Sequence, residues 1–180
     1  MKTSTWDIVA WNGAATAALT DYGALPPERR NLLRLLFSEP ETRANLAGWE
    51  GHARFAVASF RLETARAGSS EAAFALVDEL SRSSPEFADM WRDHEVGPNG
   101  KGVKHINHRT AGPLTFEYAT FAVDEQPDLG LVVLNPATPA DRERIKVLVR
   151  GLAGRPMRVI DPATHYRAKS SRLFPRSRQA

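Results

Sequence analysis

Three histidines that lie close together in the sequence, His94, His105 and His108, are the side chains best suited to acid–base or metal chemistry. Asp93 and Glu95 flank the first of them, so a general acid–base pair or a metal site is the chemistry that these residue types could perform. On a regular strand His105 and His108 would point to opposite faces and could not chelate one ion. We therefore expect no metal site, an exposed His105, and a His108 that is hydrogen-bonded near the sheet.

Catalytic and nucleotide-binding motifs are missing from this sequence. It contains no G-x-S-x-G, H-E-x-x-H or G-x-G-x-x-G pattern, and the glycines of residues 97–102 lack the spacing of a phosphate-binding loop and indicate a turn. The chain has no cysteine, which excludes disulfides, thiolate metal sites and a cysteine nucleophile. We expect a protein that is not an enzyme and that needs no cofactor, with a small enzyme based on His94 as the least favoured alternative.

Arg54 is the cation whose position in the sequence is most informative. It follows Ala53, which belongs to an apolar helical stripe, so its stem could lie on apolar surface while its guanidinium reaches an acid. That acid is either Glu50, one helical turn earlier, or the carboxylate of a bound ligand. A helix-surface ion pair with Glu50 is the commoner arrangement, and the sequence leaves both alternatives open.

Helices are predicted for the part of the chain before residue 96. Alternating apolar residues over 6–12 predict a buried strand, and Asn12 can cap the short helix that follows it. A second helix is expected over 28–37, after two prolines, and a further turn begins at Pro40. The longest helix is predicted over 49–66, with one inward stripe formed by Trp49, Ala53, Val57 and Phe60.

Three more helices and three strands complete the expected elements, and Phe74, Val77 and Leu80 mark the first of these helices. Ser84 followed by Pro85 predicts a helix start, with Phe87 and Trp91 on one face. The pattern then alternates, and strands are expected over 103–108, 114–123 and 129–134. A final helix after Thr138 would bury Ile145, Leu148, Val149 and Leu152. The order of elements predicts an α+β fold, with a mainly antiparallel sheet and helices packed on one of its faces.

Composition indicates one globular domain with a basic tail. The chain has 180 residues, 42% of them hydrophobic, and a sequence pI near 9.5. Seven Lys or Arg residues but only one acidic residue lie after residue 150, so the preceding part is mildly acidic. We expect a domain over 1–152 and a disordered tail over 153–180. The sequence has neither a secretion signal nor a long apolar run, which favours a cytoplasmic protein without membrane contact.

Several spaced motifs carry a resemblance to a known family. They are Trp6-Asp7 leading to Asn12; Leu25-Pro26-Pro27 with Leu36-Phe37; Trp49-Glu50 with Arg54, Val57 and Arg61; Ser84-Pro85-Glu86-Phe87 with Trp91 and His94; and Lys104, His108, Gly112-Pro113-Leu114 and Tyr118 before Leu131-Val132-Val133. In this order they resemble the C-terminal ligand-binding domain of MmyB-like transcription regulators, a branch of the XRE-type helix-turn-helix proteins common in actinobacteria. The resemblance spans roughly residues 6–137. Two positions depart from it, Arg109 after His108 and Leu134-Asn135 after the last motif.

The resemblance implies a PAS-like module that holds a fatty-acid-like ligand between its sheet and its helices. Aromatic residues are expected to supply part of the lining, and burial of an acyl chain is worth about 0.8 kcal/mol for each CH₂ group. Arg54, His94 or His108 is the expected partner of the ligand's headgroup. The chain of the ligand would lie along Trp49, Val57, Phe60, Trp91, Phe116 and Tyr118.

The same resemblance sets the expected partners. Family members carry a helix-turn-helix domain before the Trp-Asp motif, and we expect that domain to be absent from this chain. DNA would then be contacted only by the missing domain, or weakly by the basic tail. An interaction protein that pairs with a regulator is the main alternative function, and a homodimer is left open.

Overall fold

The computed structural model describes residues 1–67, 70–93 and 101–152. The predicted basic tail and His94 therefore lie outside the described residues. The described elements follow in the order β1 (Lys2–Thr3), α1 (Gly13–Ala18), the 3-10 helix η1 (Pro27–Arg29), α2 (Leu32–Ser38), α3 (Pro40–Asn45), α4 (Trp49–Ala67), α5 (Glu71–Ser83), α6 (Pro85–Arg92), β2 (Lys101–His108), β3 (Gly112–Val123), β4 (Gln126–Pro136) and α7 (Pro139–Gly151).

The four strands form one curled antiparallel sheet in the order β1-β4-β3-β2. Lys104 pairs with Phe116, and Tyr118 pairs with Leu134. Since directly paired residues point to the same face, the register defines an inner face that includes Lys104, Ile106, Leu114, Phe116, Tyr118, Thr120, Val132 and Leu134. The neighbouring residues of each strand form the outer face, where Phe121 pairs with Leu131 and both side chains are exposed.

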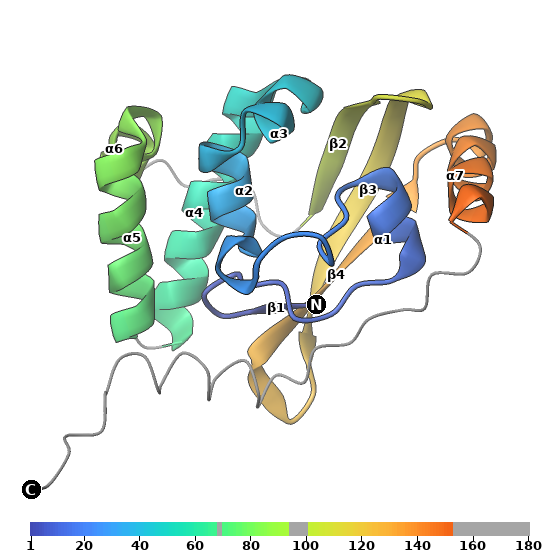
Figure 1. The fold of residues 1–180 in the computed structure, drawn as a ribbon. Helices are drawn as coiled ribbons and strands as arrows, with labels where there is room; N and C mark the ends of the chain where they lie inside the picture. Colours follow the sequence, from blue (N-terminus) through green and yellow to red (C-terminus); the bar gives the residue numbers. More distant parts are fainter. Residues whose placement is uncertain (68–69, 94–100, 153–180) are drawn as a thin grey trace, which may run out of the picture.

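The helices form two groups beside this sheet (Figure 1). In the first, α4 packs against α2 and α6, and α5 packs against α2 and α6. In the second, α1 and α7 pack against each other and contribute Ala18 and Ile145 to a cluster with Leu114 and Phe116. The predicted α+β class, with helices packed on one face of an antiparallel sheet, is confirmed.

Side-chain caps explain where most of these helices begin. Asn12 caps α1, and the Ser84 side chain accepts from the Phe87 amide to cap α6, as the sequence predicted. Thr138 caps α7 in the same way. Ser84 is also the C-cap of α5, which ends at Ser83, so a single position separates the two helices. Each side-chain oxygen satisfies an amide that has no partner within its helix.

The predicted strand over 6–12 is wrong. The strand paired with β4 is Lys2–Thr3 instead, and the chain then turns back through Trp6, which has a φ of 63°. The Ile8 amide donates to the Arg30 carbonyl, and Asp7 forms an isolated bridge with Asn31. The segment after Trp6 is thus buried by the start of α2 and by the N-terminus rather than by a sheet. An alternating apolar pattern cannot distinguish these two environments.

Two smaller differences concern helices. The helix predicted over 28–37 is divided, because η1 ends at Arg29 and Asn31 caps a separate α2. In α7 Ile145 is buried as predicted, whereas Val149 is exposed at the helix surface. No helix in the described part of the chain is long and apolar enough to cross a membrane.

Candidate functional site

The inner face of the sheet is covered at one end and incompletely covered at its middle. At the covered end, Leu114 and Phe116 are buried against α1 and α7. Toward the middle of the same face, Tyr118, Thr120 and Val132 are only half-buried. These three residues define a strip of the inner face that the described helices do not fully enclose.

Tyr118 forms the floor of this strip beside the edge strand β2. Its ring makes an edge contact with Phe55 of α4, with 5.8 Å between the centroids. The ring also lies over Gly102, where an added Cβ atom would stand 2.8 Å from the Tyr118 hydroxyl. A glycine at that strand position therefore lets the tyrosine lie across β2. Burial raises the pKa of the Tyr118 hydroxyl, so it stays a neutral hydrogen-bond donor.

Lys104 is the charged residue of this part of the inner face. Its Nζ lies 5.9 Å from the centroid of the Tyr118 ring. Among the residues that the structure describes, no carboxylate lies within ion-pair distance of this ammonium group. Burial lowers the pKa of Lys104. His52 on α4 is close enough that burial first, and then the charges of Lys104 and His105, lower the pKa of its imidazole.

A second lysine lies at the opposite edge of the sheet, and it has an acidic partner. Lys2 of β1 is buried, and its Nζ lies 2.5 Å from a carboxylate oxygen of Glu63 on α4. The same carboxylate oxygen accepts a hydrogen bond of 2.7 Å from the Trp6 indole. Burial lowers the pKa of Lys2, whereas Glu63 acts in the opposite direction. This edge of the sheet is therefore closed by the protein's own ion pair.

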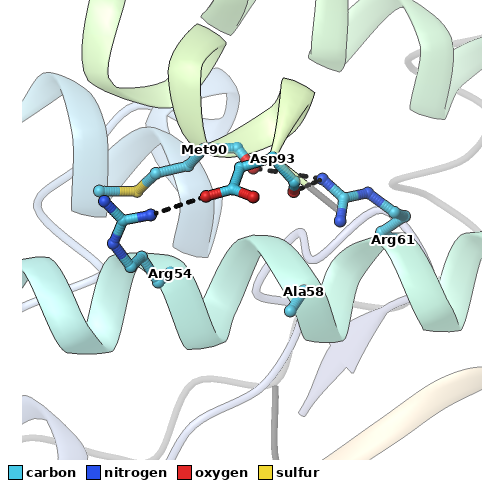
Figure 2. Close-up of a pocket in the computed structure, with 5 residues that line it drawn as sticks. All are labelled: Arg54, Ala58, Arg61, Met90 and Asp93. Carbon is cyan, nitrogen blue, oxygen red and sulfur yellow. Dashed lines mark hydrogen bonds and ion pairs between the residues drawn. The ribbon is translucent and has the colours of Figure 1, made fainter. Parts of the chain in front are cut away.

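Arg54, a predicted headgroup partner, lies on the side of α4 that faces the end of α6. Its guanidinium forms ion pairs with Glu50 at 3.1 Å and with Asp93 at 3.2 Å, and its side chain is 45% exposed. The alternative of a helix-surface ion pair with Glu50 is thus present. Figure 2 shows Arg54 and Arg61 reaching from α4 to the end of α6, with Asp93 between them.

Arg61 ties the same two helices together. Its guanidinium donates to the carbonyl oxygens of Met90, Trp91 and Asp93, and it lies 4.9 Å from the Trp91 ring centroid. Those carbonyls end α6 and have no partner within the helix, so a cation here is favourable. The crevice between the two arginines has a volume of about 10 Å³, which is room for about one water molecule. It cannot accept an acyl chain.

The apolar residues predicted to line the site do not all meet in one place. Val57 and Phe60 are 1% and 0% exposed in the core of the first helical group, a cluster of buried residues that also contains Trp49. Trp91 packs against that core and stacks on Phe87 with 5.9 Å between the centroids. By contrast, Phe116 belongs to the cluster under α1 and α7. Only Phe116 and Tyr118 of the predicted set lie on the inner face of the sheet.

His108 is on the inner face, and the protein itself uses both of its ring nitrogens. Nε2 lies 2.9 Å from the carbonyl oxygen of Ala17 at the end of α1, and Nδ1 accepts from the amide of Ala111 at 3.1 Å. This agrees with the expectation of a hydrogen-bonded histidine near the sheet. His105 is exposed on the outer face, also as expected. Within the described ranges no group of three His, Asp or Glu residues could hold a metal ion.

Sequence reasoning does not identify Lys104, His52 and Phe55 as site residues. Lys104 belongs to one of the family motifs, and one further signal could have singled it out. It occupies a position of β2 that alternation places on the same face as Ile106, where an apolar residue is the norm. His52 and Phe55 lie off the apolar stripe of α4, and only the packing of α4 beside β2 and β3 brings them to the site.

The chain matches a known protein family. A family described as the MmyB-like transcription regulator ligand binding domain matches residues 2–148. Among curated proteins, no relative matches the chain.

Proposed function

Because the chain belongs to the family of MmyB-like transcription regulator ligand-binding domains, we propose that it binds a fatty-acid-like effector on the inner face of its sheet. Membership supports a small-molecule ligand, and the incomplete burial of the inner face supports placing it there. The observation that carries the proposal is the half-buried strip around Tyr118, Thr120 and Val132, which continues from the buried Leu114 and Phe116 on the same face.

An apolar tail fits this strip by simple energetics. Each CH₂ group removed from water contributes about 0.8 kcal/mol, and part of this gain is offset by the entropy lost on association. Extended acyl chains are long and thin, so they can lie along a strip between helices without a wide cavity. The polar groups beside the strip are few, which suits a ligand with a single headgroup.

Binding is tested first on the protein as purified. We expect native mass spectrometry to show a bound small molecule, and saturated acids of ten to eighteen carbons to raise the melting temperature, because a ligand that binds only the folded state stabilises it. The absence of both signals would contradict the proposed function.

The position of the ligand is tested with two neighbouring residues of β4. Val132 lies on the inner face and Leu131 on the outer face. A Val132→Trp variant should abolish the thermal shift by filling the strip. The matched Leu131→Trp variant should retain it, because its larger side chain extends away from the strip. Equal loss in both variants would place the ligand elsewhere.

A further inference from the structure

The inner face of the sheet carries one lysine on each edge strand, and the two lysines differ in their partners. Register places Lys2 opposite Gly130, and Lys104 opposite Phe116, so both side chains leave the sheet on its inner side. Lys2 is neutralised by Glu63. In the part of the chain that the structure describes, Lys104 has no such carboxylate, and its neighbours Phe116, Tyr118, His52 and His105 supply none.

An ammonium group held partly out of water without an anion is costly. Desolvation disfavours its charged form, which is the cause of the lowered pKa of Lys104. A nearby aromatic ring offsets only part of that cost, since 5.9 Å is near the outer limit of a cation–π contact. Apolar residues of similar length would fill the same position on β2 at lower cost. The charge is therefore best explained by an anion that is bound there when the site is filled.

The surroundings define which anion would fit. The Tyr118 ring, which lies across β2 over Gly102, belongs to the half-buried strip and brings that strip close to Lys104. Its hydroxyl can donate a second hydrogen bond to an oxygen atom of the same anion. One cation and one neutral donor match a carboxylate, and the adjacent strip takes an apolar tail.

We propose that Lys104, assisted by the Tyr118 hydroxyl, binds the carboxylate of the ligand, and that the site thereby selects acids over neutral lipids of equal chain length. This inference rests on the proposed function and names the part of the site that sets its specificity. It assigns the headgroup contact to Lys104 rather than to Arg54 or His108, whose polar atoms are engaged by the protein.

The test compares tetradecanoic acid with tetradecan-1-ol by isothermal titration calorimetry, because the two share a chain and differ in charge. The wild-type chain should bind the acid at least about tenfold more tightly, the effect of one charge-assisted hydrogen bond. Lys104→Met should remove this preference while leaving the affinity for the alcohol within about twofold. Lys104→Arg should keep most of the preference. Lys146→Met, which alters an exposed lysine of α7 paired with Glu143, is the control and should bind as the wild type does.

Each result supports or overturns the assignment. A Lys104→Met variant that binds the acid as tightly as the wild type does overturns it, while the proposed function stands. A wild-type chain that binds acid and alcohol equally well also overturns the assignment and leaves the proposed function intact. A wild-type chain that binds neither removes the proposed function together with the inference. Tyr118→Phe, which deletes only the hydroxyl, should lower the affinity for the acid by less than Lys104→Met does.

Discussion

The two sides of α4 have opposite packing. On one side Val57 and Phe60 are fully enclosed by α2, α5 and α6. On the other, Phe55 meets the ring of Tyr118, and the inner face of the sheet beyond it is only half-buried. The same helix thus serves as the centre of a filled core and as one wall of an incompletely covered strip. Stability and ligand binding are therefore expected to depend on different residues of one small domain.

The largest expected effect breaks the filled side. Phe60→Ala should lower the free energy of unfolding by about 3–5 kcal/mol, because it leaves a cavity that its packed neighbours cannot close. Tyr118→Ala on the other side should cost less, since that residue is only half-buried. Urea denaturation of both variants measures the difference. Equal losses would contradict the contrast between the two sides.

A second prediction concerns Asn31, which links the N-terminal segment to the start of α2. Asn31 is buried, accepts from the amides of Leu33 and Arg34, and donates to the Thr5 carbonyl. Asn31→Ala should lower the free energy of unfolding by about 2 kcal/mol, through loss of the cap and of buried hydrogen bonds.

Asn12 provides the matched control for that prediction. It also caps a helix, but its hydrogen bond to the Ala15 amide is exposed. Asn12→Ala should therefore cost about 0.5–1 kcal/mol in the same denaturation experiment. If the two variants lose the same amount, the buried bonds of Asn31 contribute nothing beyond its cap.

The two lysines of the inner face sharpen the comparison further. Lys2→Met should lower the free energy of unfolding by about 1–3 kcal/mol, because Glu63 loses its partner beside the Trp6 indole. Lys104→Met should leave the stability of the unliganded protein unchanged or raise it by up to about 1 kcal/mol, since it removes a desolvated charge. A clear loss of stability in Lys104→Met would show that this lysine has a structural role.

The smallest effect is a difference in pH dependence. The pKa of Lys104 is lowered in the folded protein, so between that value and the usual lysine value of 10.5 the unfolded chain binds more protons. Lys104 therefore adds a contribution to stability that increases as the pH rises through this interval. In thermal unfolding, the stability of the wild type relative to Lys104→Met should therefore increase through this interval, so that any advantage of the variant at neutral pH becomes smaller. Affinity for a carboxylic acid should fall over the same interval, because Lys104 loses its charge.

Much of the domain could be predicted from local patterns. The caps at Asn12, Ser84 and Thr138, the long helix α4 and the alternation of β3 depend on neighbouring residues, and the structure confirms each of them. The first strand was misplaced because its apolar residues are buried by the N-terminus and by the segment around Arg30 and Asn31. Burial by a distant segment leaves the same alternating pattern as burial in a sheet.

Local sequence spacing thus indicates on which face of a helix or strand a side chain lies. The residues that this side chain contacts depend on how the elements pack. The sequence by itself determined the family, the α+β class and the inward stripe of α4. Only the tertiary structure decided that this stripe belongs to a filled core, that Arg54 also pairs with Asp93 at the end of α6, and that Lys104 lies beside a half-buried strip. The physical reason is that partners are chosen by long-range packing, which no local spacing encodes.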